Sequence, residues 1–140
     1  MINLVFAESC NEMTSELTTK RYVFLLLDGF SPMGFNCALE TLAHANRHKS
    51  GQIYYSWRII SEGGTHAVGW NGVTISCDGG LGPMSRDETL VVVGGEGIVA
   101  ATTPNVLNFL RREARKGIEV GAVSSAVYPL AKAGLLHEKH

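Results

Sequence analysis

The stretch EVGAVSSAVYPLAKAGLL, residues 119–136, decides the fold of this chain. It begins as a short apolar strand, bends at two serines and continues as a helix. This order is typical of a nucleophile elbow, in which the side chain at the bend is exposed at the end of a buried strand. The backbone is crowded there, so small residues are needed two positions before and after the bend, and Ala122 and Ala126 flank Ser124 at that spacing. The stretch therefore predicts Ser124 at the bend, either as a nucleophile or as the remnant of one.

Before the elbow, apolar runs alternate with capped helical segments. Continuous apolar runs predict buried strands at residues 21–29 and 89–97, and further strands are predicted at residues 54–61 and 118–123. Two segments that open with a capping residue followed by proline predict helices over residues 31–51 and 103–117. Asn71-Gly72 between extended segments predicts a β-hairpin. This order predicts an α/β fold of three layers, doubly wound, with a mostly parallel sheet of the flavodoxin-like kind.

Length and composition are those of one globular domain. The chain has 140 residues, of which 45% are hydrophobic and 18% charged. Residues 1–20 show no sustained period, so we expect a loose leader there and the α/β domain over 21–140. The last helix ends in AGLLHEKH without a closing strand. We therefore expect a chain truncated at its C-terminus, as a fragment or as a subunit completed by a partner.

The charge and the apolar pattern of the sequence argue against several classes of protein. The net charge of −1 argues against binding of nucleic acid by this chain alone. No apolar run reaches membrane-spanning length, and the N-terminus lacks the basic region of a signal peptide. The three cysteines show no C-x-x-C spacing, so reduced thiols are expected. These features predict a cytoplasmic protein that does not contact membranes.

Three segments are expected to meet at the carboxyl edge of the sheet, where open parallel sheets bind their ligands. They are residues 28–33, 94–97 and 124–126. The pair Gly94-Gly95 either presents backbone N–H groups to a ligand or only permits a tight turn. Glu96 beside it is either a buried acid or a solvated one. The three segments together are the predicted site.

A nucleophilic Ser124 needs a general base within hydrogen-bond reach. The chain has five histidines, which are His44, His48, His66, His137 and His140. The first two lie one helical turn apart and most simply face solvent, and no third ligand accompanies them to bind a metal. The third lies in the hairpin, and the last two lie in the short tail after the elbow helix. None is a convincing base, and no metal site is predicted.

Aromatic residues concentrate around the second strand and the hairpin. They are Tyr54, Tyr55, Trp57 and Trp70. Such a group can form a cage for a quaternary ammonium ligand. The same residues can equally serve as packing for the core and the edge strand. The sequence leaves both interpretations open.

The segments RYVFLLLDGFSPMGF, VVVGGEG and VGAVSSAVYPLAKAGLL carry a family resemblance. Over residues 21–136 the chain resembles the class I glutamine amidotransferase-like domain found at the N-terminus of one branch of AraC-type transcriptional regulators. PfpI-type intracellular peptidases share this architecture. In the enzymes of the superfamily a cysteine occupies the elbow and a following histidine assists it. Here Ser124 stands in the cysteine's place, Ser125 follows, and Ala126 stands where glycine is usual.

The resemblance implies a sensor rather than an enzyme. The acid of the enzymes has no clear equivalent in FSPMGFNCALE, and the threonine-histidine-tryptophan segment that commonly follows AGLL in the regulators is absent. The resemblance thus implies a non-catalytic domain without a cofactor that binds a small metabolite, with amines and amino-acid derivatives such as betaines or carnitine as the ligand class. The expected pocket residues are Phe30, Ser31, Gly95, Glu96, Ser124 and Ser125.

The same resemblance implies a homodimer that contacts DNA only through a helix-turn-helix half outside this chain. Two alternatives remain. One is a serine hydrolase or amidase of the PfpI-like superfamily that uses Ser124. The other is a pure assembly domain that pairs through the sheet edge or through the helix at residues 104–116.

Overall fold

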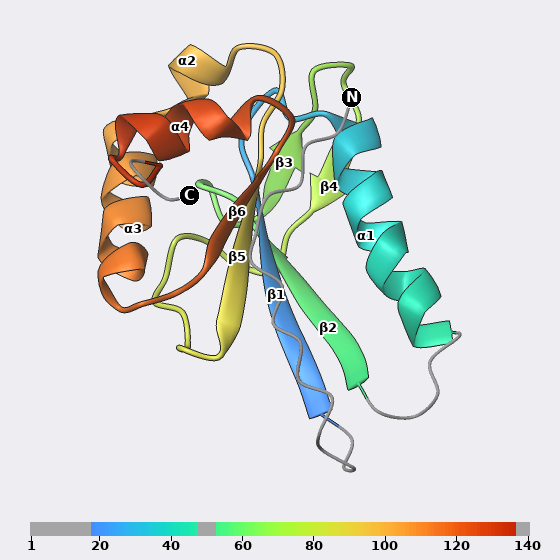
Figure 1. The fold of residues 1–140 in the computed structure, drawn as a ribbon. Coiled ribbons are helices and arrows are strands. Elements are labelled where there is room, and N and C mark those ends of the chain that lie inside the picture. Colours follow the sequence, from blue (N-terminus) through green and yellow to red (C-terminus); the bar gives the residue numbers. More distant parts are fainter. Residues whose placement is uncertain (1–17, 48–52, 137–140) are drawn as a thin grey trace.

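The computed structural model describes residues 18–47 and 53–136, and its centre is a parallel sheet (Figure 1). The four strands of this sheet lie in the order β2-β1-β5-β6 and all neighbours pair in parallel. Their bounds are Thr18–Leu26 for β1, Ile53–Ile60 for β2, Glu88–Val93 for β5 and Val120–Val123 for β6. The predicted α/β fold with a parallel sheet is confirmed.

Helices cover both faces of the sheet and make the outer layers (Figure 1). One face carries α1, Pro32–Arg47, together with a small antiparallel hairpin of β3, His66–Val68, and β4, Thr74–Ser76. The other face carries α2, Ile98–Ala101, α3, Pro104–Arg115, and α4, Val127–Lys132, which follows a 3₁₀ turn at Ser124–Ala126. The chain therefore forms three layers, as predicted.

Alternate residues of β1 supply two separate apolar cores. Val23 and Leu25 pack with α3 and α4, whereas Phe24 packs edge-to-face on Phe35 of α1, with 5.4 Å between ring centroids. Every residue of β5, which lies between the two cores, is also buried. This pattern explains the continuous apolar run in the sequence, since a central parallel strand has no solvent-facing side.

The predicted helix starts and the hairpin are confirmed. Ser31 Oγ accepts a hydrogen bond from the Gly34 N–H at 3.0 Å, and Thr103 Oγ1 accepts one from the Val106 N–H at 3.2 Å. Gly72 turns the hairpin with a φ of 91°. The sequence did not predict α2, and the first strand begins at Thr18, before the expected Arg21. Gly51, the predicted stop of the first helix, lies outside the described residues.

A buried carboxylate fastens α3 to the loop before β5. The side chain of Glu113 is completely buried and lies 2.7 Å from both Lys116 Nζ and Arg112 Nε. It also accepts a hydrogen bond from the Met84 N–H at 3.2 Å, while Lys116 donates to the Met84 carbonyl. Burial raises the pKa of the Glu113 carboxyl, but these hydrogen bonds and the lysine charge outweigh burial and lower it. The carboxylate is therefore the stable form.

No helix within residues 18–47 and 53–136 is long and apolar enough to cross a membrane.

Candidate functional site

Ser124 lies at a sharp bend where β6 ends and the 3₁₀ turn begins. Its φ of 63° is the one positive value among the non-glycine residues that the structure describes. L-residues avoid this conformation because Cβ crowds the backbone, at a cost of about 1–2 kcal/mol. The flanking Ala122 and Ala126 are both buried, as the crowding of an elbow requires. The nucleophile-elbow shape predicted from the spacing is present.

Hydrogen bonds tie the three predicted segments together at the carboxyl edge of the sheet. The Ser31 N–H donates to the Gly94 carbonyl at 3.0 Å, and the Gly94 N–H donates to the Val123 carbonyl at 3.2 Å. The Ser125 hydroxyl donates to the Gly95 carbonyl at 2.8 Å. The loops after β1, β5 and β6 are thus fixed to one another at the edge where the three segments were expected to meet.

The glycine pair is required by close packing of these loops. A Cβ on Gly95 would collide with the Gly29 carbonyl oxygen and lie 2.8 Å from the Ser31 nitrogen. A Cβ on Gly94 would lie 3.0 Å from the Ala126 nitrogen. The Gly94 N–H is already used by Val123, so it is not available to a ligand. The close approach of the neighbouring loop therefore accounts for Gly94.

A shallow pocket of about 450 Å³ opens at the elbow, and we refer to it as the elbow pocket. It is lined by Ser31, Trp70, Gly95, Glu96, Ser124 and Ser125. Five of the six predicted pocket residues are thus brought together. Glu96 is exposed rather than buried, so of the two interpretations of this acid the solvated one applies.

Phe30 is the predicted residue that does not line the elbow pocket. Its side chain is completely buried and packs edge-to-face on Phe35 at 6.2 Å between centroids. Its contribution is through the backbone, because the Phe30 carbonyl accepts a hydrogen bond from the Trp70 N–H at 3.0 Å. Residue 30 lies in the segment 28–33 that was expected at the carboxyl edge, but its apolar ring is buried in the core instead.

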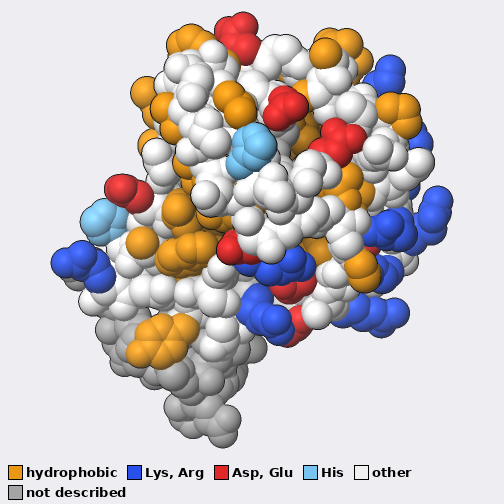
Figure 2. All heavy atoms as spheres, turned by 180° about the vertical axis from the view of Figure 1, so that it is seen from behind, with side chains coloured by type: hydrophobic (Ala, Val, Ile, Leu, Met, Phe, Trp, Pro, Cys, Tyr) orange, Lys and Arg blue, Asp and Glu red, His pale blue; other side chains and the backbone are white. Residues whose placement is uncertain are grey.

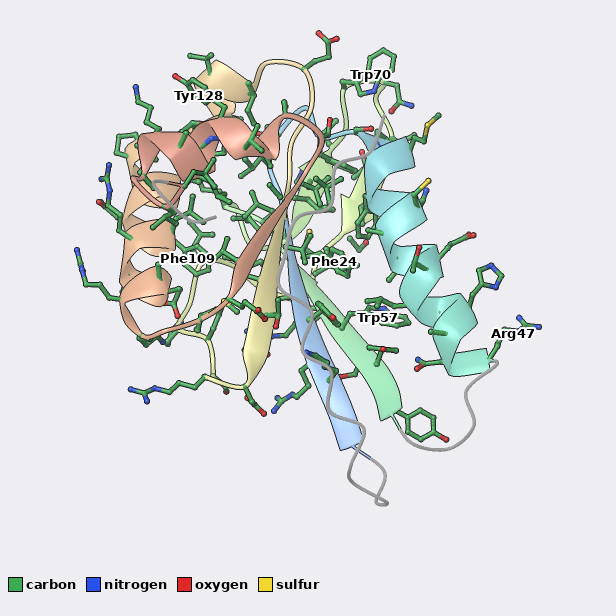
Figure 3. The ribbon with its side chains drawn as sticks, viewed as in Figure 1. Phe24, Arg47, Trp57, Trp70, Phe109 and Tyr128 are labelled. Atoms are coloured by element: carbon green, nitrogen blue, oxygen red, sulfur yellow. The ribbon has the colours of Figure 1, made fainter. Side chains whose placement is uncertain are left out.

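Trp70 is the pocket residue that the sequence analysis did not assign to this site. It lies at the tip of the hairpin and is 58% exposed. Trp57 lies on β2 far down the same face, where it packs with Tyr55 against the α1 side (Figure 3). The four aromatic residues therefore do not form one cage. The hairpin signal at Asn71-Gly72 predicted the turn, but only the contact between hairpin and Phe30 places its tip at the elbow.

The elbow pocket offers binding groups without a base for Ser124. None of the described residues forms a hydrogen bond with the Ser124 hydroxyl, and no histidine lines the pocket. His44 is exposed on α1, 3.9 Å from Glu40, and His66 lines a different cavity. The pocket supplies three hydroxyl groups, one carboxylate and one indole, a set that can hold a polar or cationic small molecule.

Residues His48, His137 and His140 lie outside the described part of the chain. Among the residues that are described, no three histidine, cysteine, aspartate or glutamate side chains are placed to hold a metal ion.

Comparisons with known proteins agree with this geometry. Residues 20–140 match the DJ-1/PfpI family. The HTH-type transcriptional regulator CdhR of Pseudomonas aeruginosa is 39% identical over 113 residues, which are 81% of this chain and 33% of that protein. The HTH-type transcriptional regulator GlxA of Rhizobium meliloti is 34% identical over 121 residues, which are 86% of this chain and 37% of that protein. The chain spans about a third of the length of these curated relatives.

Solved structures share the fold. An AraC family transcriptional regulator from Pseudomonas putida has a TM-score of 0.68 and 24% identity, over 83% of this chain and 62% of that chain. A ThiJ/PfpI family protein from Pseudomonas syringae has a TM-score of 0.69 and 18% identity, over 91% of this chain and 54% of that chain. At these identities the likeness concerns the arrangement of the elements.

The family predicted from the elbow, the glycine pair and the first strand is thus confirmed by two comparisons. The family match extends over nearly the whole described chain, and relatives with the same domain are named transcriptional regulators. The chain belongs to the DJ-1/PfpI family.

Proposed function

We propose that this chain is the sensing and dimerising domain of an AraC-type transcriptional regulator, with the elbow pocket as its effector site. Relatives that carry the domain are named HTH-type transcriptional regulators, which supports this assignment. One observation carries the proposal. The strained elbow is retained at Ser124, whereas no described residue offers that hydroxyl a base. Because a serine hydroxyl needs a base to act as a nucleophile, this arrangement favours binding over catalysis.

The effector proposed here is an amine or an amino-acid derivative, with betaines and carnitine as the first compounds to test. The indole of Trp70 can attract a cationic head group through its π face. The carboxylate of Glu96 adds a charge of the required sign, and the hydroxyls of Ser31 and Ser124 can bind a polar tail. No lysine or arginine lines the pocket to oppose a cation.

The remaining parts of the proposal concern the whole regulator. DNA binding is assigned to a helix-turn-helix half outside this chain, because a net charge of −1 does not favour contact with phosphates. Cytoplasmic location and a homodimer complete the proposal. Effector binding would act by favouring one arrangement of the two subunits, in proportion to its differential affinity.

Calorimetric titration of glycine betaine and carnitine into the chain tests the effector site. We expect saturable binding of at least one of the two, weakened roughly fivefold by Trp70→Ala through the lost cation–π contact. The matched control is Trp57→Phe, which changes the other tryptophan and should leave affinity unchanged. Equal affinity in wild type and Trp70→Ala would place the ligand elsewhere.

A serine hydrolase or amidase is the second candidate, and the elbow conformation of Ser124 favours it. A fluorophosphonate probe decides between the two, because it labels only a serine activated by a base. The sensor proposal predicts no labelling of the folded chain. Labelling that disappears in Ser124→Ala would establish the enzyme instead.

Sedimentation velocity tests the dimer. We expect the sedimentation coefficient to rise with protein concentration as subunits pair. A coefficient that stays at the monomer value across the concentration range would remove dimerisation from the proposal and leave the sensing part intact.

A further inference from the structure

The backbone of Phe30 lies between the two sides of the elbow pocket. It pairs with Gly69 of the hairpin in a parallel bridge and with Gly95 of the loop after β5 in an antiparallel bridge. Both partners belong to the walls of the pocket, since Trp70 follows Gly69 and Gly95 is itself a lining residue. The hairpin and the loop after β5 are thus joined through one residue, whose own side chain is completely buried.

We propose that Gly69 is a positioning residue of the elbow pocket. Because it has no side chain, the hairpin can lie directly on Phe30 and on the start of α1, and this contact holds the indole of Trp70 at the pocket. The role rests on the effector site proposed above, since it concerns how the aromatic wall of that site is held. The position of Trp70 can be measured with no effector present, so the two proposals can fail separately.

The space at Gly69 is too small for a side chain. A Cβ there would lie 2.8 Å from Pro32 Cγ, 3.2 Å from Pro32 Cδ and 3.1 Å from the Phe30 carbonyl oxygen. Carbon atoms that are not bonded to each other normally stay about 3.5–4.0 Å apart. The Pro32 ring is rigid and opens α1, so it cannot turn aside as a flexible side chain would. The hairpin would therefore have to move away from α1 to admit even a methyl group.

Hydrogen bonds on both sides of Gly69 fix the hairpin at this contact. The Gly29 N–H donates to the Val68 carbonyl at 2.9 Å, and the Trp70 N–H donates to the Phe30 carbonyl at 3.0 Å. A Cβ on Gly69 would press on that same Phe30 oxygen. The hydrogen bond that holds the backbone of Trp70 is therefore the one that a side chain at Gly69 would weaken.

The indole of Trp70 depends on this anchoring because it is mostly exposed and receives little support from packing. Figure 3 shows Trp70 at the end of the hairpin, beside the start of α1. On the face that Figure 2 shows, most lysine and arginine side chains lie in the lower part, whereas the carboxyl edge of the sheet is at the top. The contact at Gly69 thus keeps an aromatic group at the edge where a cationic head group meets fewer like charges, and a wall that is ordered in advance loses little entropy on binding.

Amide hydrogen exchange of the chain without an effector tests how Trp70 is held. In wild type we expect the Trp70 amide to exchange more slowly than the Asn71 amide, for which the described residues offer no acceptor. Gly69→Ala should speed exchange of the Trp70 amide about fivefold, as expected for one weakened hydrogen bond. Gly63→Ala is the control, because a Cβ there meets nothing within 4 Å. Equal exchange of the Trp70 and Asn71 amides in wild type, or an unchanged Trp70 rate in Gly69→Ala, would overturn the proposal.

Pro32→Ala supplies a rescue variant. It removes the ring atoms that a Cβ on Gly69 would meet first, and the remaining distance of 3.1 Å to the Phe30 oxygen needs a shift of only a few tenths of an ångström. The double variant Gly69→Ala/Pro32→Ala should therefore recover most of the slow exchange of the Trp70 amide. Exchange as fast as in Gly69→Ala alone would contradict crowding against Pro32 as the cause.

Calorimetric titration of glycine betaine and carnitine shows whether the contact serves binding, by means of a double-mutant cycle. Gly69→Ala should weaken binding about fivefold, as Trp70→Ala does, and the double variant should bind no more weakly than Trp70→Ala alone. A general loss of structure would instead add to the effect of Trp70→Ala. Additive losses, or full affinity in Gly69→Ala, would overturn the positioning role. If wild type binds neither compound, the effector proposal fails, whereas the exchange rates still decide whether Gly69 holds Trp70.

Discussion

The backbone of Ser124 is held in a left-handed conformation by the packing around it. Val123 before it is extended and buried, and Ala126 after it is completely buried, so neither side of the bend can relax. Strain of this kind persists where the surrounding structure determines it, and it clusters at binding and catalytic sites. The small residues at both ends of the bend made this feature readable from the sequence.

The strain at Ser124 predicts how the chain responds to substitution there. Ser124→Val should lower the free energy of unfolding by about 2 kcal/mol, because a branched Cβ is disfavoured at positive φ. Ser124→Gly, the matched control, removes the Cβ and should stay within about 1 kcal/mol of wild type. Urea unfolding followed by circular dichroism measures both. Equal stability of the two variants would show that the bend is not strained.

Gly95 is the second residue whose identity the site depends on. Ala at this position would press its Cβ against the backbone of the β1 loop, at Phe30 and Ser31. We expect Gly95→Ala to lower the free energy of unfolding by about 2 kcal/mol, since backbone cannot move aside as a side chain can. Gly82→Ala is the control, because a Cβ there meets nothing within 4 Å. Unchanged thermal melting of Gly95→Ala would mean that the loops are not closely fastened.

At the scale of elements, α3 depends on a charge that its own sequence pattern did not indicate. The buried side of α3 carries Val106, Phe109 and Leu110, yet Glu113 also lies there, completely buried. The carboxylate of Glu113 connects α3 to the loop at Met84 through a hydrogen bond. Its two cationic partners, Arg112 and Lys116, are partly exposed to solvent. A charged residue inside a helix gives no local signal of burial, and only the contacts with Met84, Lys116 and Arg112 explain it.

Glu113→Gln should lower the free energy of unfolding by about 2 kcal/mol at pH 7, because Lys116 and Arg112 lose their partner. The pKa of Glu113 is lowered in the folded chain, so its stabilisation is present above roughly pH 4.3, the unfolded value, and is lost as pH falls through the folded value. Urea unfolding between pH 7 and pH 3 should therefore show a smaller loss in Glu113→Gln than in wild type. An identical pH profile would contradict this role, and Glu40→Gln, on the exposed side of α1, serves as control.

At the scale of the whole molecule, the sequence predicted what depends on local signals and missed what depends on distant contacts. Cap-then-proline starts at Ser31 and Thr103 predicted two helices correctly, because capping is decided within one turn. The short α2 has no such signal, since its preceding Gly97 offers no capping side chain. The hydrogen bond between the hairpin and the Phe30 carbonyl places Trp70 at the elbow, and core packing on Phe35 keeps the Phe30 ring out of the pocket. No local sequence pattern encodes either contact.

The carboxyl edge of the sheet thus carries two neighbouring hollows that share Glu96. The elbow pocket combines three hydroxyl groups with an exposed indole. The loops around both hollows are fastened by the same backbone contacts between residues 28–31 and 94–97. A ligand in the elbow pocket would therefore meet an ordered surface rather than a collapsing one.

The central claim is that the elbow pocket binds a small molecule, and the indole N–H signal of Trp70 tests it most directly. A ¹H–¹⁵N NMR titration of the chain with glycine betaine, carnitine and free amino acids should move this signal and the Ser124 amide together and saturably for at least one compound. The account predicts that Trp57→Phe keeps the response and that Glu96→Gln weakens it. A folded chain in which no compound moves either signal, or in which only signals far from Ser124 move, would contradict the account.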